Sequence, residues 1–405
     1  MFTKKDKTTS KPSSRITDFS YISSDDIYMD TACQSMRPQP VVDALVEYYQ
    51  KNNACGGRVK YKWGQKVDSE IESTRQSVID YLGLSEKSYV CSFTLNTTYG
   101  INLILNQLPE GKYKQVITSE IEHNSVFLTT IELSKRLNIP RKVLPREDEG
   151  NLIYSETDLD RAVVVVNAAS NIDGRLLLNI KQLIKDTHKS GGIVIIDAAQ
   201  AMAHYRSLLL GCEADAFCFS AHKMYSASLG GIVIRKDLLK SMDHKIVGGG
   251  MVSAVRDQSY DLLPDDMASW LEPGLQAYGE IIALGSAIEW LKSVKPNGQK
   301  PAEYISNMSK KLFDGLSSIP DLRLINKSPS SVISVYSPKI DAHRLTIFLS
   351  GAGIMVRSGY FCCHYYLIEK LHMPPLLRFS IGLHTTDEDI DRTIAALKKF
   401  IGETN

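Results

Sequence analysis

Short runs of β-branched residues alternate along this chain with longer segments of helical spacing, and this alternation constrains the fold more than any other feature. The run AlaValValValValAsn at 162–167 is apolar almost throughout, which is typical of a strand buried on both faces of a sheet. Further strands are predicted at 27–32, 90–93, 115–118, 141–144, 193–196, 216–219 and 231–234. Helices are predicted at 40–49, 65–82, 97–107, 124–136 and 179–189. Such a succession indicates an α/β fold with a mostly parallel sheet covered by helices on both faces.

A segment rich in Pro, Gly and Lys at 294–301 interrupts this pattern. Beyond it the sequence predicts a strand at 331–336, a helix at 341–350, a strand at 376–381 and a last helix capped by Thr386. We therefore predict an N-terminal arm and small-domain segment at 1–27, a large domain at 28–290 and a smaller α+β C-terminal domain at 291–405.

Composition excludes several classes of partner. With 47 basic and 46 acidic side chains the net charge is +1, which attracts neither nucleic acid nor an anionic membrane and favours a small-molecule partner. No window approaches the roughly 18 uninterrupted apolar residues that cross a bilayer. Residues 1–15 lack the apolar core of a secretory signal, which favours a disordered arm over a transit peptide. The seven cysteines form no CxxC pair, which is typical of a cytoplasmic protein without a cysteine-ligated metal.

Two reactive side chains follow two of the predicted strands. Asp197 ends the apolar run at 193–196, and Lys223 comes shortly after the run at 216–219. In open α/β sheets, ligands gather at the carboxyl ends of strands. A lysine there can form a Schiff base with an aldehyde, and an aspartate can hold a pyridine nitrogen protonated. Either residue alone is more often a surface lysine or a helix cap, but the pair predicts a site for pyridoxal 5′-phosphate (PLP).

Hydroxyl and imidazole groups near these strand ends suit a phosphate. Thr97 and Thr98 open a predicted helix after the strand at 90–93, where main-chain amides bind anions. Ser220 and His222 flank the lysine and can donate hydrogen bonds to phosphate. Taken alone, the two threonines would be read as ordinary helix caps.

Three further groups suit the ring of the cofactor. His123 follows the strand at 115–118 and could stack on a flat heteroaromatic ring, although a lone histidine is more often packed or solvated. Asn171 and Gln200 also follow strands and could reach the ring hydroxyl; the alternative for Asn171 is a polar turn. Five consecutive strand ends thus each supply a group that PLP needs.

At this point the chain resembles a known family. The order ThrThr-x-Gly-x-Asn, GluHis, Asn-x-x-SerAsn, Asp-x-x-Gln and Ser-x-HisLys is similar to the class V aminotransferase superfamily, within it to cysteine desulfurases and selenocysteine lyases. The match runs from about residue 28 to the C-terminus. ArgSerGlyTyrPheCys at 357–362 resembles the Arg-x-Gly-x-x-Cys of group II desulfurases, which have a short cysteine loop, and 378–391 resembles their closing Arg-x-Ser motif. The resemblance implies the PLP-dependent transferase fold, fold type I, with PLP in the large domain.

The resemblance also implies a role for each residue. Lys223 becomes the Schiff-base lysine, Asp197 the pyridinium partner, and His123 the stacking residue and acid/base. The phosphate ligands are Thr97, Thr98, Ser220 and His222, and the ring hydroxyl lies at Asn171 and Gln200. Substrate binding falls to Arg378, which would hold the carboxylate, with Arg357 and Asn171, and the sulfur acceptor is Cys362.

The implied activity is that of a PLP-dependent cysteine desulfurase, which releases L-alanine from L-cysteine and keeps the sulfur as a persulfide on Cys362. Sulfur mobilisation for iron–sulfur cluster assembly, a homodimer and a sulfur-acceptor protein would accompany it. Arg357 or His364 is expected to supply positive charge that lowers the pKa of the Cys362 thiol. The alternatives are a selenocysteine lyase, a cysteine lyase, another class V enzyme such as an epimerase or aminotransferase, and a PLP-fold partner protein without turnover.

The sequence departs from the family pattern at several positions. Leu275 stands where family members carry a threonine that reaches the phosphate of the neighbouring subunit, which removes one hydroxyl. Tyr360 and Phe361 replace a HisHis pair before the catalytic cysteine, and the stretch 56–64 replaces a HisArgGly stretch near the active-site entrance. Cys363 adds a second candidate thiol, and alignment with the motif favours Cys362.

Overall fold

The computed structural model describes residues 15–57 and 59–404. The predicted N-terminal arm therefore lies, as far as residue 14, outside the described residues, and so does Arg58 in the stretch 56–64. Within the described part, no helix combines the length and the apolar character needed to cross a membrane.

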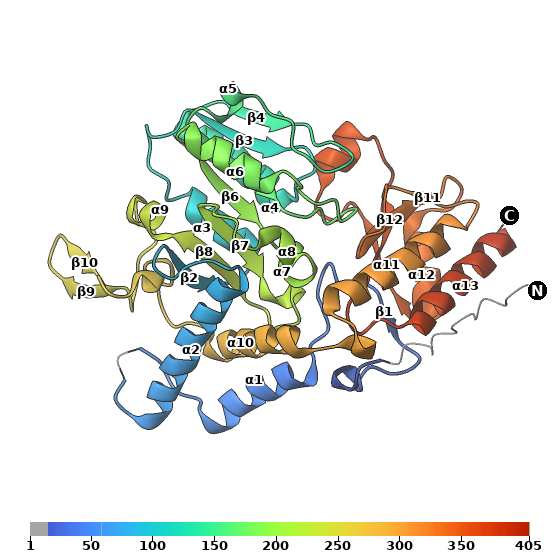
Figure 1. Cartoon of the computed structure of the whole chain (residues 1–405), viewed down its shortest axis with the longest axis horizontal. Coiled ribbons are helices and arrows are strands. Elements are labelled where there is room, and N and C mark those ends of the chain that lie inside the picture. The colour runs from blue at the N-terminus through green and yellow to red at the C-terminus, as the bar shows by residue number, and fades with distance from the viewer. Residues whose placement is uncertain (1–14, 58, 405) are drawn as a thin grey trace, which may run out of the picture.

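A central sheet organises the first two thirds of the chain (Figure 1). Its seven strands, counted over the described residues, lie in the order β2 (Tyr89–Thr94), β8 (Gly230–Arg235), β7 (Ala216–Ser220), β6 (Ile193–Asp197), β5 (Ala162–Asn167), β3 (Gln115–Ser119) and β4 (Arg141–Leu144). Strand β8 runs antiparallel to both of its neighbours, and all the other pairs are parallel. The predicted α/β fold with a mostly parallel sheet is confirmed.

The sheet is buried on both faces, as the uninterrupted apolar runs require. On β5, Val164 and Val166 pack into one apolar core together with α6, whereas Val163 and Val165 pack into a second core with α3 and α4. The helices of this part are α1 (Gln39–Lys51), α2 (Lys62–Tyr81), α3 (Thr97–Leu105), α4 (Asn124–Leu137), α5 (Glu156–Leu159), α6 (Ile180–Lys189), α7 (Ala201–His204), α8 (Arg206–Leu209), α9 (Lys236–Lys240) and α10 (Tyr278–Ser293).

A second, antiparallel sheet lies in the C-terminal part, shown in orange and red in Figure 1. Its strands lie in the order β11 (Arg323–Leu324), β12 (Val332–Tyr336), β15 (Leu376–Ser380) and β14 (Arg357–Gly359). The accompanying helices are α11 (Pro301–Ser317), α12 (Ala342–Gly351) and α13 (Asp387–Thr404). Thr386 and Asp389 exchange capping hydrogen bonds at the start of α13, which confirms the predicted cap.

The N-terminal segment belongs spatially to this second sheet. Strand β1 (Ile27–Tyr28) pairs in parallel with β13 (Ile354–Met355), and Asp30 forms a β-bridge with Ser380. The predicted strand at 27–32 is therefore only two residues long, followed by a single bridge. The division of the chain into domains at residues 27 and 290 stays a prediction.

Several elements were not predicted from the sequence. Among them are helix α11, the hairpin of β9 (Val252–Val255) and β10 (Tyr260–Leu262), and a π-helical turn at Tyr365–Lys370. Helix α11 begins at Pro301, the last residue of the Pro/Gly/Lys segment. Proline favours the first turn of a helix, so a residue that was read as a break is the start of a helix.

Candidate active site

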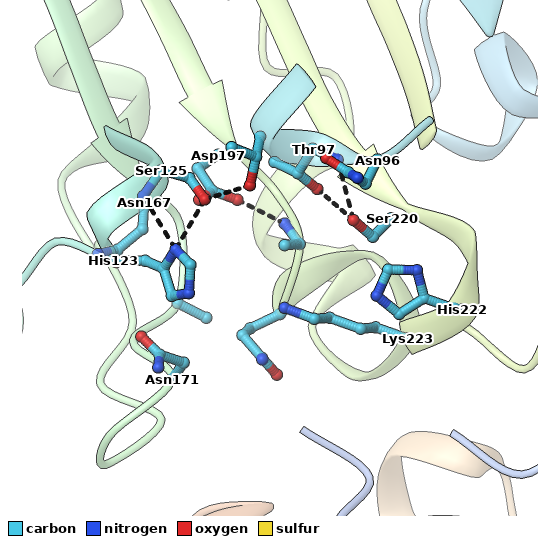
Figure 2. Close-up of a pocket in the computed structure, with 14 residues that line it drawn as sticks. Asn96, Thr97, His123, Ser125, Asn167, Asn171, Asp197, Ser220, His222 and Lys223 are labelled. Atoms are coloured by element: carbon cyan, nitrogen blue, oxygen red, sulfur yellow. Dashed lines mark hydrogen bonds between the residues drawn. The ribbon is translucent and has the colours of Figure 1, made fainter. Parts of the chain in front are cut away.

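The carboxyl ends of β5, β6 and β7 meet the N-termini of α3 and α4 around a cavity of about 230 Å³ (Figure 2). The structure brings together in its lining every residue that the sequence assigned to the cofactor, namely Thr97, Thr98, His123, Asn171, Asp197, Gln200, Ser220, His222 and Lys223. Further lining comes from Asn96, Ser125, Asn167, Ala169 and Ala199. The shared position supports one binding site, whereas the role of each side chain stays a prediction.

The N-terminus of α3 forms one end of the cavity. Asn96 caps the helix by accepting the N–H of Tyr99 at 2.9 Å. Ser220 Oγ accepts the N–H of Thr97 at 3.0 Å and lies 2.6 Å from its hydroxyl, as Figure 2 shows. The main chain of Asn96 packs directly against Gly230 on β8, where an added Cβ would lie 2.5 Å from the Asn96 Cα. The positive end of a helix dipole and several hydroxyls here suit a phosphate.

Lys223 and Asp197 also line the cavity. Lys223 ends a short 3-10 turn after β7, and Asp197 is the last residue of β6. Burial lowers the pKa of the Lys223 amine, and the charge of Asp197 partly opposes that shift. Burial also raises the pKa of the Asp197 carboxyl, which accepts the N–H of Ala199 at 2.9 Å. A buried carboxylate of this kind is stabilised when a cation comes to face it.

Both imidazoles of the cavity are neutral at physiological pH. Burial, followed by the positive charges of Lys223 and Arg378, lowers the pKa of His123 to about 4. The Nδ1 of His123 accepts the N–H of Ser125 at 3.0 Å, which leaves the proton on Nε2. Burial and the charge of Lys223 lower the pKa of His222 to about 4 as well. Each ring can therefore donate one N–H without carrying charge.

Glu122 is a part of the site that the sequence reading missed. Its buried carboxylate accepts two hydrogen bonds of 2.8 Å from Asn167, one from the main chain and one from the side chain. Burial raises the pKa of Glu122 to about 7. This contact fixes the end of β5 beside Asp197, its register partner on β6. The only available signal was the position of Glu122 directly before His123.

The segment after β1 contacts two residues of the cavity lining, Gln200 and His222. Gln200 donates its side-chain N–H to the carbonyl of Ala32 at 2.7 Å, and Ser35 donates its main-chain N–H to the carbonyl of His222 at 2.8 Å. Gln200 thus has a main-chain partner that the sequence did not indicate. Its predicted contact with the cofactor ring is a separate expectation that stays untested.

Arg378 and Arg357 lie beyond the cavity lining and share one carboxylate. Arg378, on β15 and 3% exposed, donates to Asp30 at 3.1 Å and to the carbonyl of Asn171 at 3.1 Å. Arg357 donates through Nε to the other oxygen of Asp30 at 2.9 Å. Its remaining contact is with the sulfur of Cys33 at 2.9 Å, so the structure gives the guanidinium a thiol partner other than the expected Cys362. The sequence analysis assigned no role to Asp30 or Cys33.

The two adjacent cysteines have opposite environments. Cys362 is exposed, and its carbonyl accepts the N–H of Asn124, the residue after His123, at 2.6 Å. Cys363 is fully buried and donates its S–H to the carbonyl of Glu122 at 3.1 Å. Burial raises the pKa of the Cys363 thiol well above its ordinary value. A thiol must be accessible and ionised to act as a nucleophile, so the structure favours Cys362 over Cys363.

The profile of the Aminotransferase class-V family matches residues 27–393. The chain belongs to this family. The cysteine desulfurase of Enterobacter sp. (strain 638) is 26% identical over 386 residues, which cover 92% of this chain and 93% of the relative. The solved apo structure of a cysteine desulfurase from Thermococcus onnurineus NA1 has a TM-score of 0.84 at 25% identity and covers 93% of this chain and 95% of its own.

A second similar structure contains the cofactor itself. It is a C-DES mutant with glycine covalently linked to its PLP cofactor, with a TM-score of 0.78 at 17% identity, covering 94% of this chain and 98% of its own. The likeness places this class V chain in the PLP-dependent fold type I, which confirms the predicted fold. Leu275, which departs from the family pattern, is 76% exposed, and its aliphatic side chain has no hydrogen-bond donor for a phosphate.

Proposed function

We propose that this class V chain is a PLP-dependent cysteine desulfurase that converts L-cysteine into L-alanine and a persulfide on Cys362. The observation that carries the proposal is an exposed thiol, Cys362, next to a pocket whose residues fit PLP. The loop of Cys362 is hydrogen-bonded to two segments that reach the pocket, through Asn124 and Asn171. The cysteine desulfurases among its relatives support the same assignment.

The residues of the pocket fit PLP. The N-terminus of α3 with Thr97, Thr98, Ser220 and His222 would hold the phosphate, Asp197 the ring nitrogen, and Lys223 the aldehyde carbon. When bound, PLP withdraws electrons from the Cα of an attached amino acid. Asp197 suits a protonated ring nitrogen because its carboxylate is buried and, among the described residues, accepts a hydrogen bond only from a main-chain N–H. A cation beside this carboxylate would stabilise its charge.

The chain's own residues would then act on the substrate. Arg378 would hold the carboxylate, and the Lys223 amine, which burial makes easier to deprotonate, would take the Cα proton. The Cys362 thiolate would attack the substrate sulfur. A sulfur–sulfur bond then forms as the Cβ–sulfur bond breaks, and the former Cβ gains a proton, so that L-cysteine plus a thiol gives L-alanine plus a persulfide.

Product analysis tests this function. The holoenzyme, incubated with L-cysteine and without reductant, should release L-alanine in amounts equal to the persulfide located on Cys362 by mass spectrometry. Alanine release with selenocysteine alone would instead identify a selenocysteine lyase. Pyruvate with free sulfide would identify a cysteine lyase, and no turnover with intact cofactor binding would identify a partner protein.

We also propose a homodimer that passes sulfur to an acceptor protein, in the cytoplasm. Large apolar side chains are exposed near the cavity's helix α3 and in α2, among them Leu95 at 69% and Trp63 at 53%. Leu95 directly precedes Asn96 of the cavity lining, so a second subunit that covered Leu95 would also lie beside the cavity. Sedimentation should give a dimer at concentrations where activity is full, and a fully active monomer would contradict the proposal.

A further inference from the structure

We propose that Phe361 is a positioning residue that couples the substrate-carboxylate clamp to the sulfur-accepting thiol; this inference rests on the proposed desulfurase function. Phe361 is the residue before Cys362, and it stands where the resembling family carries the second histidine of a HisHis pair. It touches both halves of the site, through its ring on one side and its main chain on the other.

The ring of Phe361 lies against the clamp. The guanidinium carbon of Arg378 sits 4.5 Å from the ring centroid, a cation–π distance. Phe361 is 9% exposed and Arg378 is 3% exposed, so the contact is shielded from water. Cation–π attraction is stronger in such places than at the surface. A neutral ring also adds no charge that would compete for the guanidinium.

The remaining contacts of Arg378 leave one of its three nitrogen atoms without a hydrogen-bond partner among the described residues. Its two terminal nitrogens contact Asp30 and the carbonyl of Asn171. Its Nε is buried and has no hydrogen-bond partner within residues 15–57 and 59–404. A buried donor without a partner is costly, and a substrate carboxylate would satisfy it. The Phe361 ring, by covering the guanidinium, restricts the directions from which that carboxylate can approach.

The main chain of Phe361 holds the thiol. Its carbonyl accepts the side-chain N–H of Asn171 at 2.8 Å, and the next carbonyl, of Cys362, accepts the N–H of Asn124. Phe361 and Cys362 both have positive φ, 48° and 55°. Two successive non-glycine residues in this region are strained and persist only where surrounding contacts hold them. The contacts of Phe361 with Arg378 and Asn171 are part of what holds this turn.

Tyr360 provides a matched control. It is also aromatic and adjacent to the turn, but its ring faces His364 at a centroid distance of 5.7 Å. Its backbone does not have a positive φ. Loss of the Tyr360 ring should therefore leave the clamp and the thiol in place, whereas loss of the Phe361 ring should disturb both.

The test compares Phe361→Leu with Tyr360→Leu in the holoenzyme. We expect Phe361→Leu to raise the Kd for L-alanine and the KM for L-cysteine about 5- to 30-fold, the range of one desolvated cation–π contact. At saturating cysteine it should also slow persulfide formation on Cys362 several-fold in a single turnover, because the thiol is no longer fixed. Tyr360→Leu should change neither quantity more than about twofold, and Phe361→Tyr, which keeps the ring, should restore both.

Each outcome decides the proposal. If the wild type is active and Phe361→Leu changes neither substrate binding nor the rate of persulfide formation, or changes only one of them, the proposed coupling is wrong. A wild type that forms no persulfide overturns the desulfurase function, and the inference with it, which separates the two failures. Phe361→Met, which keeps side-chain volume without a ring, replaces Phe361→Leu if melting temperature or cofactor content shows that the leucine variant is misfolded.

Discussion

The candidate site has a cofactor end, the cavity around Lys223, and a thiol end, around Arg378 and Cys362. The two ends are built differently. At the cofactor end, polar groups follow successive strands of one sheet, and several are held by a neighbour, as Ser220 is by Thr97. At the thiol end, Asp30, Asn171 and the pair Phe361 and Arg378 come from three distant parts of the chain and contact one another. The cofactor end is positioned mainly by the strands of the sheet, whereas the thiol end depends on a few contacts between distant side chains. The thiol end is therefore where one substitution can change substrate preference while the fold remains.

Substitution of Lys223 should have the largest effect and breaks the cofactor end. Lys223→Ala should abolish turnover, because the chain loses both its proposed covalent link to PLP and its Cα base. After borohydride reduction, mass spectrometry should find no cofactor-modified peptide in the variant. Lys292→Ala, an exposed lysine of α10, is the matched control and should behave as wild type. A reducible adduct that persisted in Lys223→Ala would refute the assignment.

Substitution of the two cysteines compares buried with exposed thiols at the thiol end. Cys362→Ser should bind PLP normally and form no persulfide, a loss of at least 100-fold in alanine release from L-cysteine. Cys363→Ser should retain most activity, because the buried Cys363 thiol is held in its uncharged form. Persulfide located on Cys363, or on neither cysteine while alanine release continues, would reassign the sulfur acceptor or move the enzyme towards a lyase.

Removal of Arg378 should weaken substrate binding rather than the chemistry. Arg378→Ala should raise the KM for L-cysteine roughly 30-fold or more, since a charge-assisted clamp contributes on the order of 2–4 kcal/mol. PLP content should be unchanged if the two ends are as separate as their contacts indicate. Arg323→Ala, at an exposed position of the same sheet, serves as control. An unchanged KM would assign Arg378 a purely structural role.

Acid should have the smallest effect, through a histidine that anchors the thiol end. His384 is 1% exposed, and its Nε2 lies 2.9 Å from the carbonyl of Tyr28, two residues before Asp30. Burial lowers the pKa of His384 to about 4. The unfolded chain therefore binds more protons as pH falls below about 6.5, and the free energy of unfolding should drop by about 2 kcal/mol per such group at pH 5.

Urea titrations at pH 7.5 and pH 5 measure this effect. His384→Asn should show a smaller loss between the two values than wild type does. His343→Asn, at an exposed position of α12, should show the same loss as wild type. An identical pH dependence in all three proteins would exclude His384 as the group that titrates.

The two ends also differ in how far the sequence predicted them. The strands that precede or end at Asp197 and Lys223 are predicted by uninterrupted apolar runs. The position of the polar group after each run, at the carboxyl edge of the sheet, follows from sheet geometry. Every predicted cofactor residue lies in one cavity for that reason. The sequence could not pair Asp30 with Arg378 and Arg357, because no local pattern relates residues more than 300 positions apart.

Charge balance at the thiol end has a consequence for substrate choice. Two guanidiniums, of Arg357 and Arg378, share the single carboxylate of Asp30. This trio carries one surplus positive charge, which the α-carboxylate of one amino acid neutralises. An amino acid with a second carboxylate would bring an unmatched negative charge next to buried groups, where such a charge is expensive. The net charge of these three side chains therefore favours amino acids with one carboxylate, such as cysteine, over acidic ones.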